Sequence, residues 1–356
     1  MGLTPSCAPA DNLPDDMRTT FITWYPYCRR SDALADTLGG SSHLIHYFRF
    51  KQPLYAPLKY VLQTFATLRV LMRERPELVL VAVPPIFAAL PVWLWARLTG
   101  ARFVIDAHTG IFDDRRWSWL LPLTRVLFRR ADAVIVTGTH LRDRVNEWGG
   151  RALVIGDVPV TFVTGVAPPP CDGARIAVIN TFSFDEPVGA LLEAARAVPE
   201  ARFFVTGDVR HARPEWIEQR PANVTFTGFL SEEGYAGLLR AADAIVVLTT
   251  HDHTMQRGGY EAVALAQPLV TSDWGILRET FSRGTVHVVN EPSAIAAGIR
   301  TALARRDKLR SEMKSLAVER RELFDTRIGN LRSMLAAVSN STGGTAARRQ
   351  PVRSSE

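Results

Sequence analysis

The sequence predicts an α/β protein with two similar halves, each built on a parallel sheet, and three observations support this class. Apolar runs typical of buried strands alternate with helical segments along most of the 356 residues, which is the pattern of parallel sheets covered on both faces. The segment Ala131–His140 (ADAVIVTGTH) resembles Ala242–His251 (ADAIVVLTTH) along its whole length. Three consecutive prolines, Pro168–Pro170, lie between the two copies and indicate a linker.

The first half is expected to span residues 19–162, after a disordered leader at residues 1–18. The leader has no apolar run, so it does not read as a signal peptide. Helices are expected at Leu54–Arg75, Ile86–Leu98 and Trp117–Arg129. The expected strands are Thr20–Trp24, Leu44–Phe48, Leu78–Val83, Phe103–Asp106, Ala133–Thr137 and Leu153–Ile155.

The second half follows a linker at residues 163–173 and is expected to span residues 174–302. Helical spacing of Arg, Glu, Leu and Ala predicts C-terminal helices over residues 303–338, and Ser, Gly, Thr and Arg dominate a tail at residues 339–356 that we expect to be disordered. The expected strands of this half are Arg175–Asn180, Arg202–Thr206, Val224–Thr227, Ala244–Leu248, Leu269–Thr271 and Thr285–Val288.

Composition limits the classes of function. The residues are 47% hydrophobic, as in globular proteins. Cys7, Cys28 and Cys171 lie far apart without metal-binding spacing, which suits a reducing, cytoplasmic compartment. The net charge of +6 favours anionic partners such as nucleotides or phospholipid. Because no nucleic-acid-binding motif is present, we expect no nucleic-acid partner.

Two apolar stretches raise the question of membrane contact. Leu78–Leu98 is broken by Pro84, Pro85 and Pro91, so a strand, a turn and a buried helix explain it better than a membrane span. Arginines flank Trp117–Phe128 as they would an interfacial helix, but an ordinary packed face is the preferred interpretation. If the acceptor is lipid-linked, this stretch is where we expect peripheral contact with the inner face of the plasma membrane.

The most informative segment is His253–Glu279, which has the pattern of a phosphate and diol site. Gly258 and Gly259 open a short helix that carries Glu261. Backbone N–H groups at such a helix start attract anions, and a nearby carboxylate can accept hydrogen bonds from sugar hydroxyls. These features together outline a bound nucleotide sugar.

Gly258–Glu279 (GGYEAVALAQPLVTSDWGILRE) resembles the donor-site segment of retaining glycosyltransferases of family 4, which have the GT-B fold. The resemblance covers about residues 19–338. It implies two facing Rossmann-like domains, with the acceptor mainly in the first and the nucleotide-sugar donor mainly in the second, and a terminal helix that crosses back. It also implies metal-independent transfer with retention and no separate cofactor.

Four positions depart from the family pattern. His253 stands where the family has the first Glu of Glu-x7-Glu, and Arg29-Arg30-Ser31 replace the usual Gly-Gly turn. The basic pair that commonly grips the diphosphate is absent from Val178–Pro187, and Ala266-Gln267-Pro268 replaces Gly-x-Pro. These departures leave the identity of the donor open.

In the second half, Glu261 is expected to bind the ribose or sugar hydroxyls; the alternative is a carboxylate that stabilises the helix dipole. Arg257 could supply the missing diphosphate contact, because guanidinium binds phosphate bidentately, or it could be a solvated loop residue. The polar neighbours expected to contribute to donor binding are Thr254, Gln256, Ser272 and Asp273.

The remaining candidates are the catalytic histidines and the first-half arginines. His253 and His108 are expected to contact the transferred sugar or the acceptor, with a structural histidine as the alternative for His108, and Asp106 reads as a turn residue. No ligand set completes the His251–His253 triplet, so no metal is expected. Arg29 and Arg30, before a helix from about Asp32 with Ser31 as N-cap, either bind a phosphate or are exposed.

The sequence therefore predicts a hexosyltransferase-type glycosyltransferase in polysaccharide or glycolipid assembly. Its acceptor is a glycan or a lipid-linked molecule. Two alternatives remain open: a family member that binds a nucleotide sugar without turnover, and a nucleotide-sugar epimerase of the same fold, which would need acid and base residues.

Overall fold

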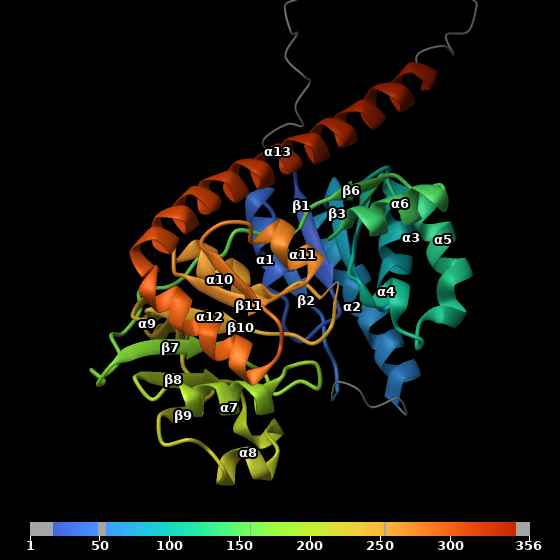
Figure 1. The fold of residues 1–356 in the computed structure, drawn as a ribbon. Coiled ribbons are helices and arrows are strands. Elements are labelled where there is room, and N and C mark those ends of the chain that lie inside the picture. The colour runs from blue at the N-terminus through green and yellow to red at the C-terminus, as the bar shows by residue number, and fades with distance from the viewer. Residues whose placement is uncertain (1–16, 49–54, 157, 253, 347–356) are drawn as a thin grey trace, which may run out of the picture. The chain divides into compact units, whose positions relative to one another are not determined.

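The computed structural model describes residues 17–48, 55–156, 158–252 and 254–346, with side chains up to residue 336. The chain forms two compact units (Figure 1). The first unit contains the described residues up to Val158 and those from Leu323 onward, and the second extends from Pro159 to Glu322.

The first unit is organised around a six-stranded parallel sheet in the order β2-β1-β3-β4-β5-β6. Strand β1 pairs with β2 on one side and β3 on the other, so the chain reverses its direction across the sheet at β1. The strands are β1 (Thr19–Thr23), β2 (Ser41–Leu44), β3 (Leu78–Val83), β4 (Arg102–Ala107), β5 (Ala133–Val136) and β6 (Ala152–Val154). The helices are α1 (Arg29–Thr37), α2 (Ala56–Glu74), η2 (Ile86–Ala88), α3 (Ala89–Thr99), α4 (Gly110–Asp113), η3 (Ser118–Leu120), α5 (Leu121–Arg130) and α6 (Thr139–Glu147).

Alternate residues of each central strand enter two separate cores, as a strand period of two requires. In β3, Val79 and Val81 pack toward the helices α2, α3, α5 and α6, whereas Leu78 and Leu80 pack toward α1. Figure 1 shows α1 and α3 on opposite sides of this sheet. The predicted continuous apolar runs therefore reflect burial on both faces.

The second unit repeats the arrangement with a six-stranded parallel sheet in the order β12-β11-β10-β7-β8-β9. Here the direction reverses at β7, which pairs with β8 and β10. The strands are β7 (Ala174–Val178), β8 (Ala201–Thr206), β9 (Val224–Gly228), β10 (Ala244–Val247), β11 (Leu269–Ser272) and β12 (Thr285–Val288). The helices are α7 (Val188–Ala197), η4 (Val209–His211), α8 (Pro214–Glu218), α9 (Glu232–Arg240), α10 (Arg257–Ala264), α11 (Gly275–Thr280) and α12 (Pro292–Ala304).

The last helix, α13 (Arg306–Ala346), belongs to both units. Its first part buries Met313 and Leu316 in a core of the second unit. Its later part buries Leu331 and Leu335 in the α1 side of the first unit. The predicted return of the terminal helix to the first half is therefore confirmed.

Three local expectations were wrong. Strand β2 is Ser41–Leu44 rather than Leu44–Phe48, because this edge strand is polar and gives no apolar signal. Helix α1 begins at Arg29 with Cys28 as N-cap, so Ser31 lies inside the helix. Helix α13 continues to Ala346, which makes the first part of the expected disordered tail helical.

The segment expected as a linker packs against helix α9. In the segment before β7, the Val166 N–H donates to the Glu233 carbonyl at 3.0 Å. A Cβ at Gly237 in α9 would lie 1.7 Å from the Val166 carbonyl oxygen, so only glycine permits this close approach of two backbones.

Candidate functional site

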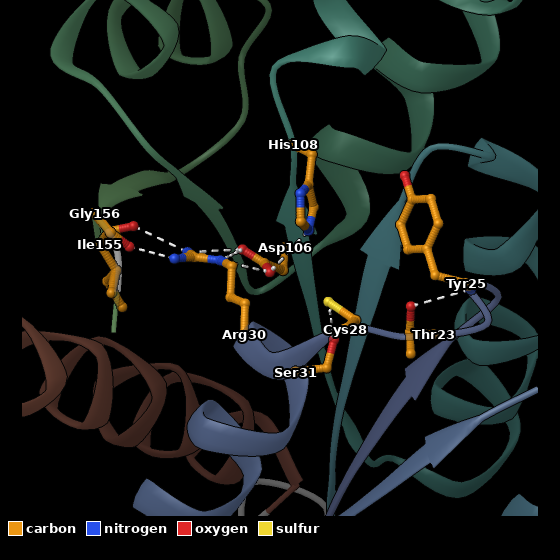
Figure 2. Close-up of polar contacts among 9 residues, drawn as sticks. All are labelled: Thr23, Tyr25, Cys28, Arg30, Ser31, Asp106, His108, Ile155 and Gly156. Atoms are coloured by element: carbon orange, nitrogen blue, oxygen red, sulfur yellow. Dashed lines mark hydrogen bonds and ion pairs between the residues drawn. The ribbon is translucent and has the colours of Figure 1, made fainter. Parts of the chain in front are cut away.

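In the first unit, polar side chains gather where β1 and β4 end. Cys28 and Arg30 come from the start of α1, just after β1, and Asp106 and His108 come from the end of β4 (Figure 2). The carboxyl ends of parallel strands are the usual ligand edge of an open α/β sheet. This group is called the strand-end cluster below.

The centre of the strand-end cluster is a buried ion pair. Arg30 Nε lies 2.9 Å from Asp106 Oδ2, and Nη2 lies 3.0 Å from Oδ1, in a two-pronged contact. The same guanidinium donates to the carbonyls of Ile155 and Gly156, which follow β6. Burial alone would raise the pKa of Asp106, but the charge of Arg30 and the contact with His108 outweigh it, and the pKa falls far below its usual range.

This geometry corrects the interpretation of Asp106 as a turn residue, because it lies within β4 and is almost fully buried. It also changes the prospects of Arg30. Its charge is neutralised by Asp106, and its N–H groups are directed at carboxylate and carbonyl oxygens. An anion bound at Arg30 would have to compete with these contacts.

His108 lies beside this pair and is a cation near neutral pH. Its Nε2 is 3.5 Å from Asp106 Oδ2, which is an ion-pair distance. Burial lowers the pKa of His108, but the contacts with Asp106 and Cys28 outweigh burial and raise it to about 9. The ring also lies against Tyr25, with 5.9 Å between ring centroids. His108 can therefore donate hydrogen bonds and stabilise negative charge.

The Cys28 thiol is the neighbour of His108 that sequence reasoning missed. Ser31 Oγ donates to Cys28 Sγ at 3.0 Å. Burial would raise the pKa of the thiol, but hydrogen bonds from His108 and Ser31 prevail and lower it. Ser31, predicted as an N-cap beside a phosphate, thus hydrogen-bonds to the Cys28 thiol. Cys28 follows one strand and His108 ends another at the same sheet edge, which is the signal that could have paired them.

The side chain of Arg29 has a different contact from that of Arg30. Its guanidinium donates to the Tyr27 hydroxyl and lies over the Tyr27 ring, with Cζ 5.6 Å from the ring centroid. The two predicted arginines therefore have separate environments, one exposed to solvent in part and one buried.

In the second unit, Glu261 is a buried carboxylate in helix α10. The Tyr235 hydroxyl from α9 donates to Glu261 Oε2 at 2.5 Å. Arg257, one turn earlier in α10, places Nε 3.5 Å from Oε1. Tyr235 was not predicted, because no local pattern links α9 to a residue 26 positions later. Tyr235 and Arg257 thus hold the Glu261 carboxylate from two sides of its oxygen pair.

The predicted glycines have a packing role. A Cβ at Gly259 would lie 2.3 Å from Cζ of Phe281, and one at Gly258 would lie 2.9 Å from Val247 Cγ2. Both positions are buried. Glycine therefore lets α10 lie close to β10 and α11. This close packing fixes the position of Glu261 relative to the sheet.

Ser272 and Asp273, predicted to touch the donor, take part in contacts at the end of β11. Ser272 Oγ accepts from Thr249 N–H at 2.9 Å and donates to Asn290 Oδ1 at 2.7 Å. Asp273 forms an ion pair with Arg278. The Ser272 contacts hold the ends of β10 and β11 in place.

The loop after β7, which lacks the family's basic pair, is closed by an acidic side chain. Glu186 accepts from the backbone N–H groups of Thr181 at 3.0 Å and Ser183 at 2.8 Å. Burial raises the pKa of Glu186 against these hydrogen bonds. N–H groups that could face an anion are thereby directed to a carboxylate of the same loop.

Of the other predicted donor residues, Thr254 and Gln256 are half-buried in the segment leading into α10. His253 lies outside the described residues, so its predicted role stays a prediction. Within the described ranges no three His, Cys, Asp or Glu side chains are grouped to hold a metal ion. No helix in this part of the chain is long and apolar enough to cross a membrane.

Two family models match the chain in succession. Residues 18–159 match the glycosyl transferase 4-like domain, and residues 175–305 match glycosyl transferases group 1. Apart from Pro159, these ranges lie one within each unit, and they end before α13 begins. No curated protein was found to match the sequence.

Solved structures share the fold at low identity. Sucrose-phosphate synthase from Thermosynechococcus elongatus is 16% identical with a TM-score of 0.66, covering 90% of this chain and 100% of that one. HepE from Anabaena, solved with UDP-glucose, is 15% identical with a TM-score of 0.62, covering 89% and 100%. A putative UDP-N-acetylglucosamine 2-epimerase from Listeria monocytogenes is 12% identical with a TM-score of 0.57, covering 84% and 91%.

The predicted fold is confirmed by two six-stranded parallel sheets in Rossmann-like halves, a shared C-terminal helix and these structural matches. Each half matches a glycosyltransferase family model. The chain therefore belongs to the group 1 glycosyltransferases and has the GT-B fold.

Proposed function

We propose that this glycosyltransferase moves a sugar from a nucleoside diphosphate sugar to an acceptor with retention of configuration, without a metal. The observation that carries the proposal is the arrangement around Glu261. Its carboxylate is buried, it accepts from Tyr235, and Arg257 lies beside it. A fixed carboxylate has acceptor positions matched to the two hydroxyls of a diol.

Arg257 and the start of α10 are suited to the charged part of the donor. The helix begins at Arg257, so its first backbone N–H groups and a guanidinium lie at the same end. Both kinds of group stabilise phosphate oxygens. Because HepE was solved with UDP-glucose and with UDP, a UDP-sugar is the first donor to test.

The strand-end cluster is suited to the acceptor or the transferred sugar. Protonated His108 can donate to a sugar hydroxyl or stabilise negative charge that develops in the transition state. In the retaining route, an oxygen of the leaving diphosphate takes the acceptor proton. Electrostatic stabilisation of the leaving group is then the main contribution required of the protein.

The acceptor belongs to a glycan or lipid-linked class, as expected for polysaccharide or glycolipid assembly at the inner face of the plasma membrane. The first unit exposes large apolar side chains such as Phe65 and Met72, which supports an acceptor carried at a membrane surface.

The test is acceptor-dependent release of free nucleoside diphosphate. Purified protein is incubated with UDP-, GDP- and ADP-sugars, with and without a bacterial lipid extract, and the anomeric configuration of the product is determined by NMR. The proposal expects release only with acceptor and a product of unchanged configuration. Epimerisation of a UDP-sugar without acceptor, or donor binding with no turnover on any acceptor, would contradict it.

A further inference from the structure

Helix α2 exposes more large apolar side chains than an ordinary surface helix does. Its inner face buries the polar Gln63 and Thr67 beside Leu71, and its outer face exposes large apolar side chains. Phe65 is 67% exposed and Met72 is 60% exposed. Leu58, Val61 and Leu62 extend the same outer face. A surface helix that only completes a fold has the opposite distribution.

Two buried polar side chains of α2 hydrogen-bond to the rest of the unit, so this orientation is built into the fold. Thr67 Oγ1 accepts from Trp24 Nε1 at 3.0 Å, and Gln63 Nε2 donates to the Ile45 carbonyl at 2.7 Å. Rotating the helix to bury Phe65 would break both contacts and leave buried polar groups without partners.

The apolar surface continues over the neighbouring helices of the same layer. Helix α3 packs against both α2 and α5. Leu94 and Leu98 of α3, Trp119 of η3 and Val126 of α5 are also exposed. This outer surface of α2, α3, η3 and α5 is called the outer apolar face below. Exposed large apolar side chains gathered on neighbouring helices indicate an interaction site.

The charged residues of these helices are basic, with one exception. Glu74 is the acidic residue of α2, α3 and α5, and it accepts from Thr20 and Ser41 and pairs with His43 rather than facing outward alone. The basic residues of the three helices are Lys59, Arg69, Arg73, Arg97, Arg125, Arg129 and Arg130.

We infer that the outer apolar face docks on the surface of an anionic lipid bilayer, with the apolar side chains among the acyl chains and the basic ones among the headgroups. Apolar residues framed by Arg, Tyr and Trp are typical of interfacial helices. Positive charge of one sign disfavours a second copy, because a symmetric contact would bring like charges together.

The inference extends the proposed function, since a docked transferase would meet a lipid-linked acceptor at the membrane. It also places the membrane contact mainly on α2, rather than on Trp117–Phe128 as the sequence suggested. In Trp117–Phe128, Leu120, Leu127 and Phe128 are buried, as the packing interpretation predicts, and only part of that stretch faces outward. The larger share of the outer apolar face comes from α2.

The test is flotation of the full chain with vesicles of phosphatidylcholine, with or without phosphatidylglycerol. Wild type is expected to float with the anionic vesicles. Phe65→Ser with Met72→Gln is expected to weaken binding about tenfold or more. Arg69→Gln with Arg73→Gln is expected to weaken it about tenfold at low salt and less at high salt. Phe229→Ser, at an exposed phenylalanine of the second unit, is the matched control and is expected to bind as wild type.

Circular dichroism and the melting temperature check that each variant folds. The substituted vesicle-binding positions are exposed, so the variants are expected to fold. Glu261→Ala is expected to float as wild type, so failure of the donor assay and failure of docking are separate results. Equal binding of wild type and Phe65→Ser with Met72→Gln would overturn the inference. A wild type that binds no vesicles would also overturn it. If that wild type instead forms a dimer or a protein complex that Phe65→Ser with Met72→Gln dissociates, the outer apolar face binds protein rather than lipid.

Discussion

The guanidinium of Arg30 and the carboxylate of Asp106 form a two-pronged ion pair, with Nε 2.9 Å from Oδ2. The pair joins the start of α1 to the end of β4, and the Ile155 and Gly156 carbonyls after β6 accept from the same guanidinium. One side chain therefore ties together three segments at the edge where His108 and Cys28 lie. Within this group, Asp106 raises the pKa of His108 and the charge of Arg30 opposes that rise.

Asp106→Asn is expected to destabilise the first unit by about 3–5 kcal/mol, because it leaves a buried guanidinium without its counter-charge. Urea unfolding measures the free energy. Glu77→Gln, which breaks the exposed pair with Arg18, is the control and should cost less than about 1 kcal/mol. Arg30→Met combined with Asp106→Leu should recover part of the loss. Equal effects of Asp106→Asn and Glu77→Gln would contradict the account of the pair.

His108 makes stability depend on pH in a stated direction. Its folded pKa of about 9 lies above the usual value of about 6.5, so its stabilisation is complete below about pH 6.5. As pH rises to about 9, the unfolded chain loses the proton first and the free energy of unfolding falls. Allowing for partial solvent exposure, the loss is about 1–3 kcal/mol.

The pH dependence that belongs to His108 is measured in a Cys28→Ser background, because the neighbouring thiol would otherwise titrate in the same range. Cys28→Ser and Cys28→Ser with His108→Gln are unfolded in urea at a series of pH values. The difference between their unfolding free energies should decrease from pH 6.5 to 9. A difference that stays constant over this range would show that His108 is not held in its charged form.

Cys28 is expected to alkylate with a pH midpoint below that of an ordinary thiol, because protonated His108 stabilises the thiolate. The midpoint, rather than the rate, is the readout, since Cys28 is nearly buried. Cys7→Ser with Cys171→Ser leaves Cys28 as the sole thiol for iodoacetamide and mass spectrometry. Adding His108→Gln should raise the midpoint; an unchanged midpoint would disprove the coupling.

Gly259→Ala is expected to destabilise the second unit by about 1–3 kcal/mol, because its Cβ would overlap the Phe281 ring. Gly275→Ala is the matched control, since a Cβ there meets no atom within 4 Å, and it should change stability by less than about 0.5 kcal/mol. Phe281→Leu should relieve part of the Gly259→Ala cost. If both alanine variants unfold at the same urea concentration, packing does not explain Gly259.

Much of the fold could be predicted because the central strands are buried on both faces. Leu78–Val83 was located to the residue, since a continuous apolar run specifies such a strand. Strand β2 could not be located in this way, because an edge strand of Ser and His has no such run. The exposed aromatic residues Tyr47 and Phe48 lie beyond its end and drew the prediction away.

Individual residues of the candidate site were predicted from the sequence, but the contacts between them were not. Glu261 and His108 follow from local pattern, because each lies at a recognisable helix start or strand end. The Arg30–Asp106 and Tyr235–Glu261 contacts join residues 76 and 26 positions apart, and only the tertiary structure brings them together. Glycines at 258 and 259 were read as anion-binding residues, but their immediate surroundings are side chains of the core.

The central claim is that Glu261 binds the donor, and isothermal titration of the nucleotide sugar identified by the release assay tests it most directly. Glu261→Ala is expected to abolish binding, and Tyr235→Phe, which removes one hydrogen bond to the carboxylate, should weaken it about three- to tenfold. Gly275→Ala serves as the control and should bind as wild type. Unchanged affinity in Glu261→Ala, in a variant that remains folded, would contradict the account.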